Sequence, residues 1–431
     1  MNATTAPESA ALLDAANPLL DFTDLPLFDA IRPEQVEPAI DSLLQAAAAA
    51  LEQVTAADFA ADWQAMALVL DVATERLGRA WGAVSHLNSV ADTPELRAAY
   101  NAALPKVTEF WTRLGADERL YAKYKAMDPA RLNAEQIQAR TNALRGFVLG
   151  GAELQGEAKE RFAAIQERQA ELGQKFSENA LDATDAWTYY ASADELDGVP
   201  ADTLAATRAA AEAEGQEGHK LTLKLPCYLP LMQFGRNRAL REKLYRAYGT
   251  RASEQAEGEA VKFDNSAIIR ELLALRQEEA TLLGYPHFAA VSLVPKMAES
   301  AEQVVAFLRE LSKKARPYAE RDLADMRAFA AETLGLTDPQ AWDWPYIGEQ
   351  LRQARYAYSE QDVKPYFTAP KSGWPAWRPQ RARSITPCGC SMRKPTENGL
   401  LCIATPRSYS MAKVSRELWP SAITTWWAGS A

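Results

Sequence analysis

Apolar residues recur every three or four positions through much of the chain between residues 30 and 367, which indicates helices with one buried face. The segment 157–183 shows this most clearly, because Glu157–Arg161 and Glu171–Lys175 form favourable i,i+4 charge pairs on its polar side. Its apolar side carries Phe162, Ile165, Leu172, Phe176 and Ala183, with Gln169 and Asn179 as polar interruptions. At 1.5 Å per residue this helix would be about 40 Å long, which is too long for a small compact domain.

Polar and glycine signals place the ends of two further helices. Asn265 or Ser266 can cap a helix that stops at Gly284, because Asn and Ser side chains accept hydrogen bonds from free amides in a first turn. Asn237 can cap another helix in the same way. The apolar positions of these two helices are Ile268, Ile269, Leu272, Leu275 and Leu282 in the first, and Leu240, Leu244 and Tyr248 in the second.

A long helix is expected after residue 300. Ser300 and Gln303 form a capping box ahead of the apolar run Val304, Phe307, Leu308 and Leu311. Pro317 should kink or split this helix, since proline lacks the amide that the helix needs, and Gly335 should end it.

One segment departs from the helical period. Residues 220–225 alternate strictly between polar residues and leucine, which predicts a strand with three leucines on one face, closed by Pro226 and Pro230. The best partner strand is 188–190, reached through an alanine-rich helix at 201–213.

The predicted fold class is mainly α, with a small β element near 187–232. A hydrophobic fraction of 48% and a charged fraction of 24% are typical of a globular protein, and no run approaches the ~20 apolar residues of a membrane span. The net charge of −10 argues against nucleic acid or a membrane surface as the main partner. Four cysteines, and only one basic residue (Arg32) among the first 36, favour a reducing cytoplasm over secretion.

The composition changes abruptly near residue 368. Residues 368–431 contain nine basic and two acidic residues, five of the eleven Trp, seven of the 24 Pro and three of the four Cys, whereas the preceding part has a net charge of −17. This tail could be a disordered basic arm, or a small metal module built on Cys388, Cys390 and Cys402, although it has no His to complete a zinc site. The abruptness of the change favours a third interpretation, in which translation in a shifted frame, or another sequence error, is fused to a genuine protein.

The residue types that carry catalysis form no motif. His86, His219 and His287 are isolated, H-E-x-x-H is absent, and no nucleotide-binding or serine-hydrolase signature occurs. Structural roles are expected for the three histidines and for Cys227, which suits a small core position. The aromatic positions Trp342, Trp344, Tyr346, Tyr356, Tyr358, Tyr366 and Phe367 either line a peptide groove or pack internally. The residues therefore predict no catalytic, cofactor-binding or metal-binding position.

The order of short segments nevertheless resembles the N-terminal part of the thimet oligopeptidase family of zinc metallopeptidases. The resemblance runs from about residue 15 to residue 367 and stops where the composition changes. The matching stretches are Ile31–Ile40, Ser85–Val90, Leu96–Tyr100, Phe176–Thr184, Leu229–Met232, Leu244–Tyr248, Thr250–Ser253, Asp264–Asn265, Lys296–Ala298 and Val363–Phe367.

This resemblance implies an elongated, mainly helical fold with two lobes flanking a channel that admits short unfolded peptides. It also implies a Zn²⁺ ion held by two His one helical turn apart and a further Glu, all in a C-terminal part that this chain lacks, so no family residue is carried over. The organisation expected is a flexible N-terminus (1–14), the helical lobe (15–367) and an aberrant tail (368–431). The intact family enzyme would be a cytoplasmic monomer.

Three hypotheses follow for this chain. It is a frame-disrupted oligopeptidase that forms one channel wall and binds no catalytic zinc, a non-catalytic helical peptide-binding module, or a non-functional remnant with exposed apolar surface.

Overall fold

The computed structural model describes residues 17–357 and Tyr366. The chain divides into two compact units whose segments alternate along the sequence. Unit 1 comprises residues 1–186 and 250–316, and unit 2 comprises residues 187–249 and 317–431. The predicted terminal segments, 1–14 and 368–431, lie outside the described residues, so the proposed domain boundaries stay predictions.

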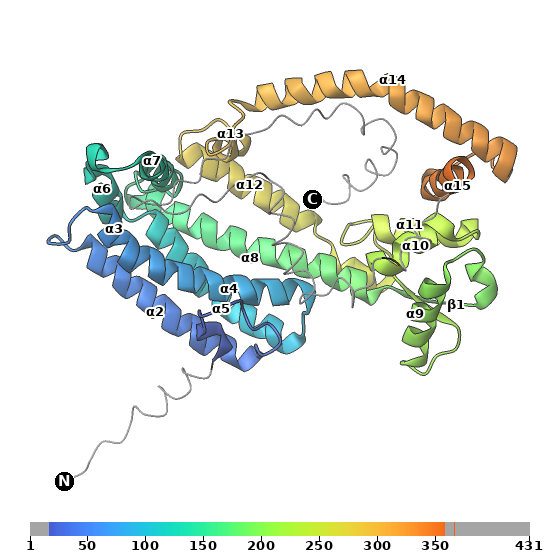
Figure 1. Cartoon of the computed structure of the whole chain (residues 1–431), viewed down its shortest axis with the longest axis horizontal. Helices are drawn as coiled ribbons and strands as arrows, with labels where there is room; N and C mark the ends of the chain where they lie inside the picture. Colours follow the sequence, from blue (N-terminus) through green and yellow to red (C-terminus); the bar gives the residue numbers. More distant parts are fainter. Residues whose placement is uncertain (1–16, 358–365, 367–431) are drawn as a thin grey trace, which may run out of the picture. The chain divides into compact units, whose positions relative to one another are not determined.

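Unit 1 is a bundle of long helices that lie side by side (Figure 1). Helix α2 packs against both α4 and α5, α5 packs against α8, and α8 packs against α12. The longer helices are α2 (Val36–Thr55), α4 (Val72–Val90), α5 (Pro94–Gly115), α7 (Ala134–Leu149), α8 (Gly156–Ala186) and α12 (Ser266–Leu282). The shorter ones are η1 (Pro18–Leu20), η2 (Pro33–Gln35), α3 (Trp63–Met66), η3 (Ala67–Asp71), α6 (Glu118–Ala126), η4 (Pro129–Arg131), η6 (Gly258–Phe263) and α13 (Phe288–Leu293).

The cores of unit 1 follow from the apolar faces of these helices. In α2, for example, Ile40 packs in one buried cluster with Leu77 and Val84 of α4, whereas Leu51 and Val54 belong to a second cluster with Met66 and Leu120. Helix α8 confirms the prediction for 157–183, with Phe162, Ile165, Leu172 and Ala183 among its buried residues.

The polar partners of α8 differ from those predicted. Arg161 pairs with Glu278 at 2.6 Å, not with Glu157, and Arg168 pairs with Glu271 at 2.6 Å. Lys175 lies 3.9 Å from Glu178 and not beside Glu171. The i,i+4 prediction was wrong for two reasons. Arg161 finds its carboxylate on the neighbouring helix α12, which a single-helix argument cannot include. Glu171 pairs with Arg168 at i,i+3 within α8, at 2.7 Å, so it is not left for Lys175.

The two polar interruptions of α8 also serve this packing. The Asn179 amide donates a hydrogen bond to Asn265 Oδ1 at 2.8 Å, and Asn265 Nδ2 donates to the Phe176 carbonyl at 3.1 Å. Gln169 Nε2 donates to Glu279 Oε2 at 2.6 Å. Because Asn265 is occupied in this way, it caps no amide of α12, and the Asp264 carboxylate accepts from the Ser266 amide instead.

Unit 2 contains a two-stranded antiparallel sheet covered by short helices. Strand β1 (Thr188–Ala191) pairs with β2 (His219–Thr222), with Thr188 opposite Thr222 and Ala191 opposite His219, which confirms the predicted partner. The other elements of this unit are η5 (Ala193–Leu196), α9 (Ala201–Glu212), α10 (Leu225–Phe234), α11 (Arg238–Gly249), η7 (Ala341–Asp343) and α15 (Trp344–Tyr356). As predicted, Asn237 caps α11, accepting from the Leu240 amide at 3.1 Å.

The strand is shorter than the alternation predicts. Leu221 and Leu223 are buried, but Leu225 is 57% exposed and begins α10. Pro226 lies in the first turn of α10, where its missing amide costs nothing, and Pro230 lies inside that helix. A proline thus starts a helix here and does not merely close a strand.

Helix α14 (Ala301–Leu334) crosses from the first unit to the second. It continues through Pro317 as one helix, so the expected split does not occur, although the two units divide at this proline. Gly335 ends it with φ +69°, as predicted. Ser300 accepts from the Gln303 amide at 3.1 Å, but the Gln303 side chain accepts from Glu299, so only half of the predicted capping box forms.

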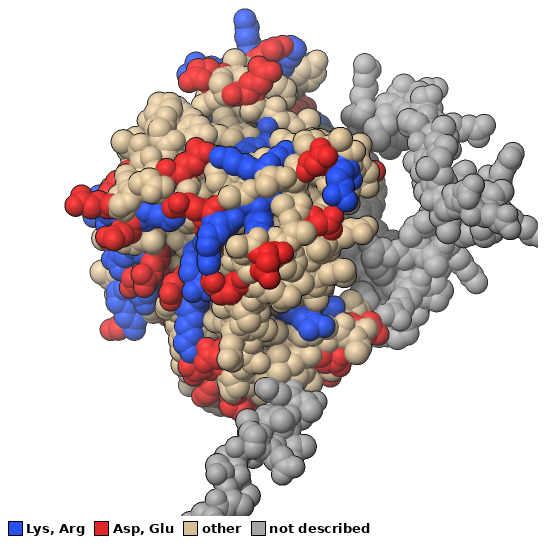
Figure 2. Space-filling model, turned by 90° about the vertical axis from the view of Figure 1, so that its left-hand side faces the viewer, with Lys and Arg blue, Asp and Glu red and all other residues tan. Residues whose placement is uncertain are grey.

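The predicted class is confirmed, since the described residues are mainly helical with one small sheet. No helix between residues 17 and 357 combines the length and the hydrophobicity that crossing a bilayer requires. On the face drawn in Figure 2, acidic and basic side chains are intermixed.

Candidate functional site

Each of the three histidines makes a contact that explains it structurally. His219 is 2% exposed, and its Nδ1 lies 3.0 Å from the Thr207 hydroxyl. His287 is the N-cap of α13, where Nδ1 accepts from the Ala290 amide at 3.1 Å. His86 lies in α4 and packs edge-on against Phe28, with ring centroids 5.4 Å apart. The structure brings no two of them into one site.

Cys227 lies on α10 in a partly buried position. The Thr222 amide donates to its Sγ at 3.4 Å, and burial raises the pKa of the thiol above its usual value. A raised pKa reduces the thiolate fraction at neutral pH, which is opposite to what a nucleophile needs. Its environment is that of a small packing residue.

The aromatic residues near the end of the described chain mostly pack internally. Trp342 lies 6.2 Å from the Tyr245 ring and under the Arg246 guanidinium, and Tyr346 is 9% exposed. Tyr356 and Tyr366 are exposed, while the predicted groove positions 358 and 367 lie outside the described residues.

The described part of unit 2 contains a buried ion pair that sequence reasoning missed. Arg241 of α11 is 2% exposed, and its Nη2 donates to Oδ1 of the fully buried Asp343 at 2.7 Å. Its Nη1 donates to the Gly235 carbonyl at 2.7 Å, and its guanidinium lies 4.4 Å from the centre of the Tyr346 ring. Arg238 adds a second contact to Asp343 at 2.8 Å.

This pair fixes the ionisation of Asp343. Burial acts to raise the pKa of the carboxyl, but hydrogen bonds from Arg238, the Gln340 amide and Arg241 outweigh burial and hold the pKa below its ordinary value. The carboxylate therefore stays charged and links η7 to α11. All of its contacts are to other parts of unit 2, so its role is structural.

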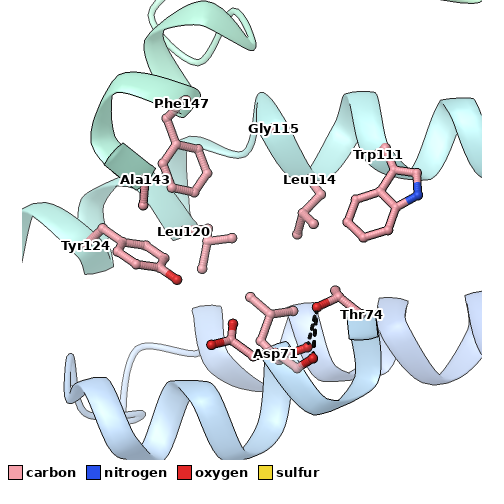
Figure 3. A pocket seen from close by; sticks show the side chains of 11 residues that line it. Asp71, Thr74, Trp111, Leu114, Gly115, Leu120, Tyr124, Ala143 and Phe147 are labelled. Carbon is pink, nitrogen blue, oxygen red and sulfur yellow. Dashed lines mark hydrogen bonds between the residues drawn. The ribbon is translucent and has the colours of Figure 1, made fainter. Parts of the chain in front are cut away.

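One cavity in the described part of unit 1 lies between η3, α4, α5, α6 and α7 (Figure 3). It has a volume of about 340 Å³ and mostly apolar walls. Its residues are Leu70, Asp71, Thr74, Trp111, Leu114, Gly115, Leu120, Tyr124, Ala143, Gly146 and Phe147.

Two ionisable groups face this cavity. Asp71 is the last residue of the short π-helical turn η3. The protein around its carboxyl removes part of the solvent, which raises the pKa of Asp71 above its ordinary value. Burial, and then repulsion by Asp71, raise the pKa of Tyr124 to about 12. Thr74 donates from its hydroxyl to the Leu70 carbonyl at 2.9 Å and so stays with the helix backbone. A single carboxyl among aromatic and apolar walls suits the binding of an apolar or cationic side chain.

Comparison with known proteins assigns the chain to a family. The profile of Peptidase family M3 matches residues 231–372, and that of the Neurolysin/Thimet oligopeptidase N-terminal domain matches residues 40–159. Oligopeptidase A of Salmonella typhimurium is 45% identical over 361 residues, which are 83% of this chain and 53% of that protein. The chain belongs to peptidase family M3.

Other curated relatives agree with this assignment. Oligopeptidase A of Haemophilus influenzae is 40% identical over 360 residues, covering 82% of this chain and 53% of the relative. A probable cytosolic oligopeptidase A of Arabidopsis thaliana is 37% identical over 374 residues, covering 83% of this chain and 52% of the relative. The chain thus spans about half the length of the curated relatives that it matches, and the family resemblance seen in the sequence is confirmed.

The described residues of this M3 chain do not fit the zinc ion that the family implies. No group of three or more His, Cys, Asp or Glu within the described part of the chain could hold a metal ion. His219 and His287 already use Nδ1 in hydrogen bonds, and His86 packs against an aromatic ring. We therefore derive no catalytic step through a metal for this chain.

Proposed function

We propose that this chain is the N-terminal part of an oligopeptidase A-like zinc endopeptidase whose reading frame is disrupted between residues 368 and 372. The supporting observation is that similarity to the Salmonella relative extends over 361 residues and that the M3 profile ends at residue 372, within the few positions where the composition changes. The intact protein would cleave short unfolded peptides in the cytoplasm as a monomer, and residues 15–367 would form one wall of its channel.

The proposal makes the chain inactive by itself. Catalysis in this class needs two His at i and i+4 to bind zinc and a Glu to act as base, and the 431 residues contain no H-E-x-x-H. We expect no hydrolysis of short peptides by the purified chain, with or without added zinc. Chelator-sensitive hydrolysis by material of this length would refute the proposal.

The coding DNA gives the decisive test of the frame disruption. The 361 matched residues make up 53% of the Salmonella relative, which is therefore roughly 680 residues long. Another frame read past codon 370 should encode H-E-x-x-H and the remaining half of a family M3 peptidase. If no frame does so, the frameshift account is wrong. The intact mass of the natural product would then show whether 431 residues are all that the cell makes.

A non-catalytic peptide-binding module is the second candidate, and the cavity in Figure 3 favours it over a chain with no ligand. Trp111 and Tyr124 offer aromatic surface, and Asp71 offers one negative charge, so a peptide with a basic side chain would bind best. Titration of the chain with such a peptide tests this function. Equal affinity for the wild type and an Asp71→Asn variant, or no binding by a well-folded sample, would exclude it.

A further inference from the structure

Helix α14 carries an apolar stripe that the described part of the chain leaves uncovered. Only Ala330 is buried among the 34 residues of the helix. Phe307 and Tyr318 are each 63% exposed, Leu308 is 51% exposed and Leu311 is 52% exposed. The stripe consists of Val304, Phe307, Leu308, Leu311 and Tyr318.

The spacing of this stripe is that of a packing face. Val304, Phe307, Leu308 and Leu311 recur at helical spacing, and Tyr318 follows Leu311 after seven residues, or two turns, so all five share one side of the helix. Arg309, Lys313 and Glu320 lie on the opposite side. Most helices in proteins owe their stability to the packing of such a face, not to helix propensity. A contiguous exposed apolar patch therefore marks a surface that another part of an assembly covers.

The comparisons indicate where the covering polypeptide is encoded. Residues 301–334 lie wholly inside the match to the Peptidase family M3 profile at 231–372, and beyond the N-terminal domain profile at 40–159. The relatives continue for about as many residues again as they share with this chain. We infer that the α14 stripe is the docking surface for the half of the peptidase that follows residue 367 in these relatives. This inference rests on the proposed function.

The charge of α14 and the length of its stripe favour binding of that missing half over binding of the chain's own segment 368–431. Helix α14 has six acidic and six basic residues, so it offers no electrostatic attraction to a tail with a net charge of +7. The sequence 368–431 also contains seven prolines, a composition that disfavours the long amphipathic helix that such a stripe would bind. The stripe from residue 304 to residue 318 is about 21 Å long, which matches the width of two packed helices at ~10 Å each.

Co-production with the missing half tests the surface directly. The full 431-residue chain is expressed together with the part of Salmonella typhimurium Oligopeptidase A that it does not match. We expect a one-to-one complex that survives gel filtration. The stripe variant replaces Phe307, Leu308 and Leu311 with Ser, and the control variant replaces Arg309, Lys313 and Glu320 with Ser. All six side chains are exposed in the chain, so neither variant should impair its folding.

The two variants should differ sharply. The stripe variant should weaken the complex by roughly 100-fold or more, because buried apolar contacts dominate such interfaces, while the control variant should change the affinity by less than about threefold. Equal affinities of the two variants, or no complex with the wild type, would overturn the inference. A dimer of the free chain that only the stripe variant dissociates would assign the stripe to a second copy and also overturn it.

A covalent fusion separates this inference from the proposed function. In a chimera, residues 1–367 are followed by the second half of the Salmonella relative, and hydrogen exchange is measured at residues 301–318. We expect protection there in the chimera, and loss of protection in its stripe variant only. Unprotected amides in a chimera that hydrolyses peptides would overturn the surface but keep the function. Protected amides in a zinc-loaded chimera that hydrolyses nothing would keep the surface and overturn the function.

Discussion

The buried pair Arg241–Asp343 provides the most direct test of what stabilises unit 2. The change Asp343→Asn preserves the shape of the side chain but removes its charge, so Arg241 stays buried without a counter-charge. Removing one partner of a buried pair lowers the free energy of unfolding by about 3–5 kcal/mol, because the remaining charge is kept from water. For the roughly 100 described residues of unit 2, each kcal/mol shifts Tm by about 4–8 °C, so Tm should fall by about 12 °C or more.

A matched exposed pair serves as the control. Asp197 carries the same carboxyl in the same unit, but it is 64% exposed and pairs with Arg236, 67% exposed, at 3.2 Å. Exposed pairs contribute only about 0–1 kcal/mol, so Asp197→Asn should hardly change the stability. The combined replacement of Arg241 by Met and Asp343 by Leu removes both buried charges, and should therefore unfold at higher urea concentration than Asp343→Asn alone.

Hydrogen exchange in a urea series measures these effects within unit 2 alone. Mass spectrometry of peptides from α11 and η7 reports the opening of the segments that the pair joins. The reasoning is refuted if Asp343→Asn and Asp197→Asn destabilise these peptides equally, within about 1 kcal/mol. It is refuted as well if the combined apolar replacement is less stable than Asp343→Asn.

Three further predictions concern single positions. The pKa of Asp343 is held below its unfolded value of ~3.9, so its contribution to the free energy of unfolding is complete above about pH 5 and is lost as the pH falls through the folded pKa. Asp343→Asn should therefore flatten the loss of stability between pH 5 and pH 2 in urea titrations. A pH dependence unchanged by the substitution would contradict this. Urea melts should show that Leu221→Ala lowers the free energy of unfolding by about 2–5 kcal/mol and Leu225→Ala by less than about 0.5 kcal/mol, because only Leu221 is buried. Similar losses for the two variants would mean that the strand extends to residue 225. Cys227 should react with a maleimide at least roughly tenfold more slowly in the native chain than in urea, as peptide mapping would show, since burial raises the pKa of its thiol; equal rates would refute this.

The elements that the sequence predicts best are those with many periods. Helix α8 repeats its apolar face over 31 residues, so its existence and buried side could be predicted from 157–183 alone. The identity of its ionic partners could not, because Arg161 finds Glu278 more than a hundred residues away. The alternation at 220–225 covers only three periods, and the helix-initiating Pro226 overrides its last one.

The buried ion pair and the cavity left weaker signals in the sequence than the long helices did. The contact between Arg241 and Asp343 joins positions 102 residues apart, and no periodicity marks either one. The cavity at Asp71 depends on a single π-helical turn, which has no sequence signature of its own. By contrast, the apolar run at 304–311 was visible in the sequence, but whether anything covers it depends on polypeptide outside the described residues.

The alternation of the two units along the chain has a consequence for protein synthesis. Strand β2, α10 and α11 leave the ribosome long before η7 and α15, which complete the same unit. At 5–20 residues per second, the 102 residues from Arg241 to Asp343 take roughly 5–20 seconds to translate. During that interval Asp343 has not been synthesised, so Arg241 cannot form its buried ion pair. The first segment of unit 2 therefore stays incompletely folded until the second segment has been translated. Ribosomes that pause before codon 343 would therefore prolong the period in which chaperones and proteases can bind this segment.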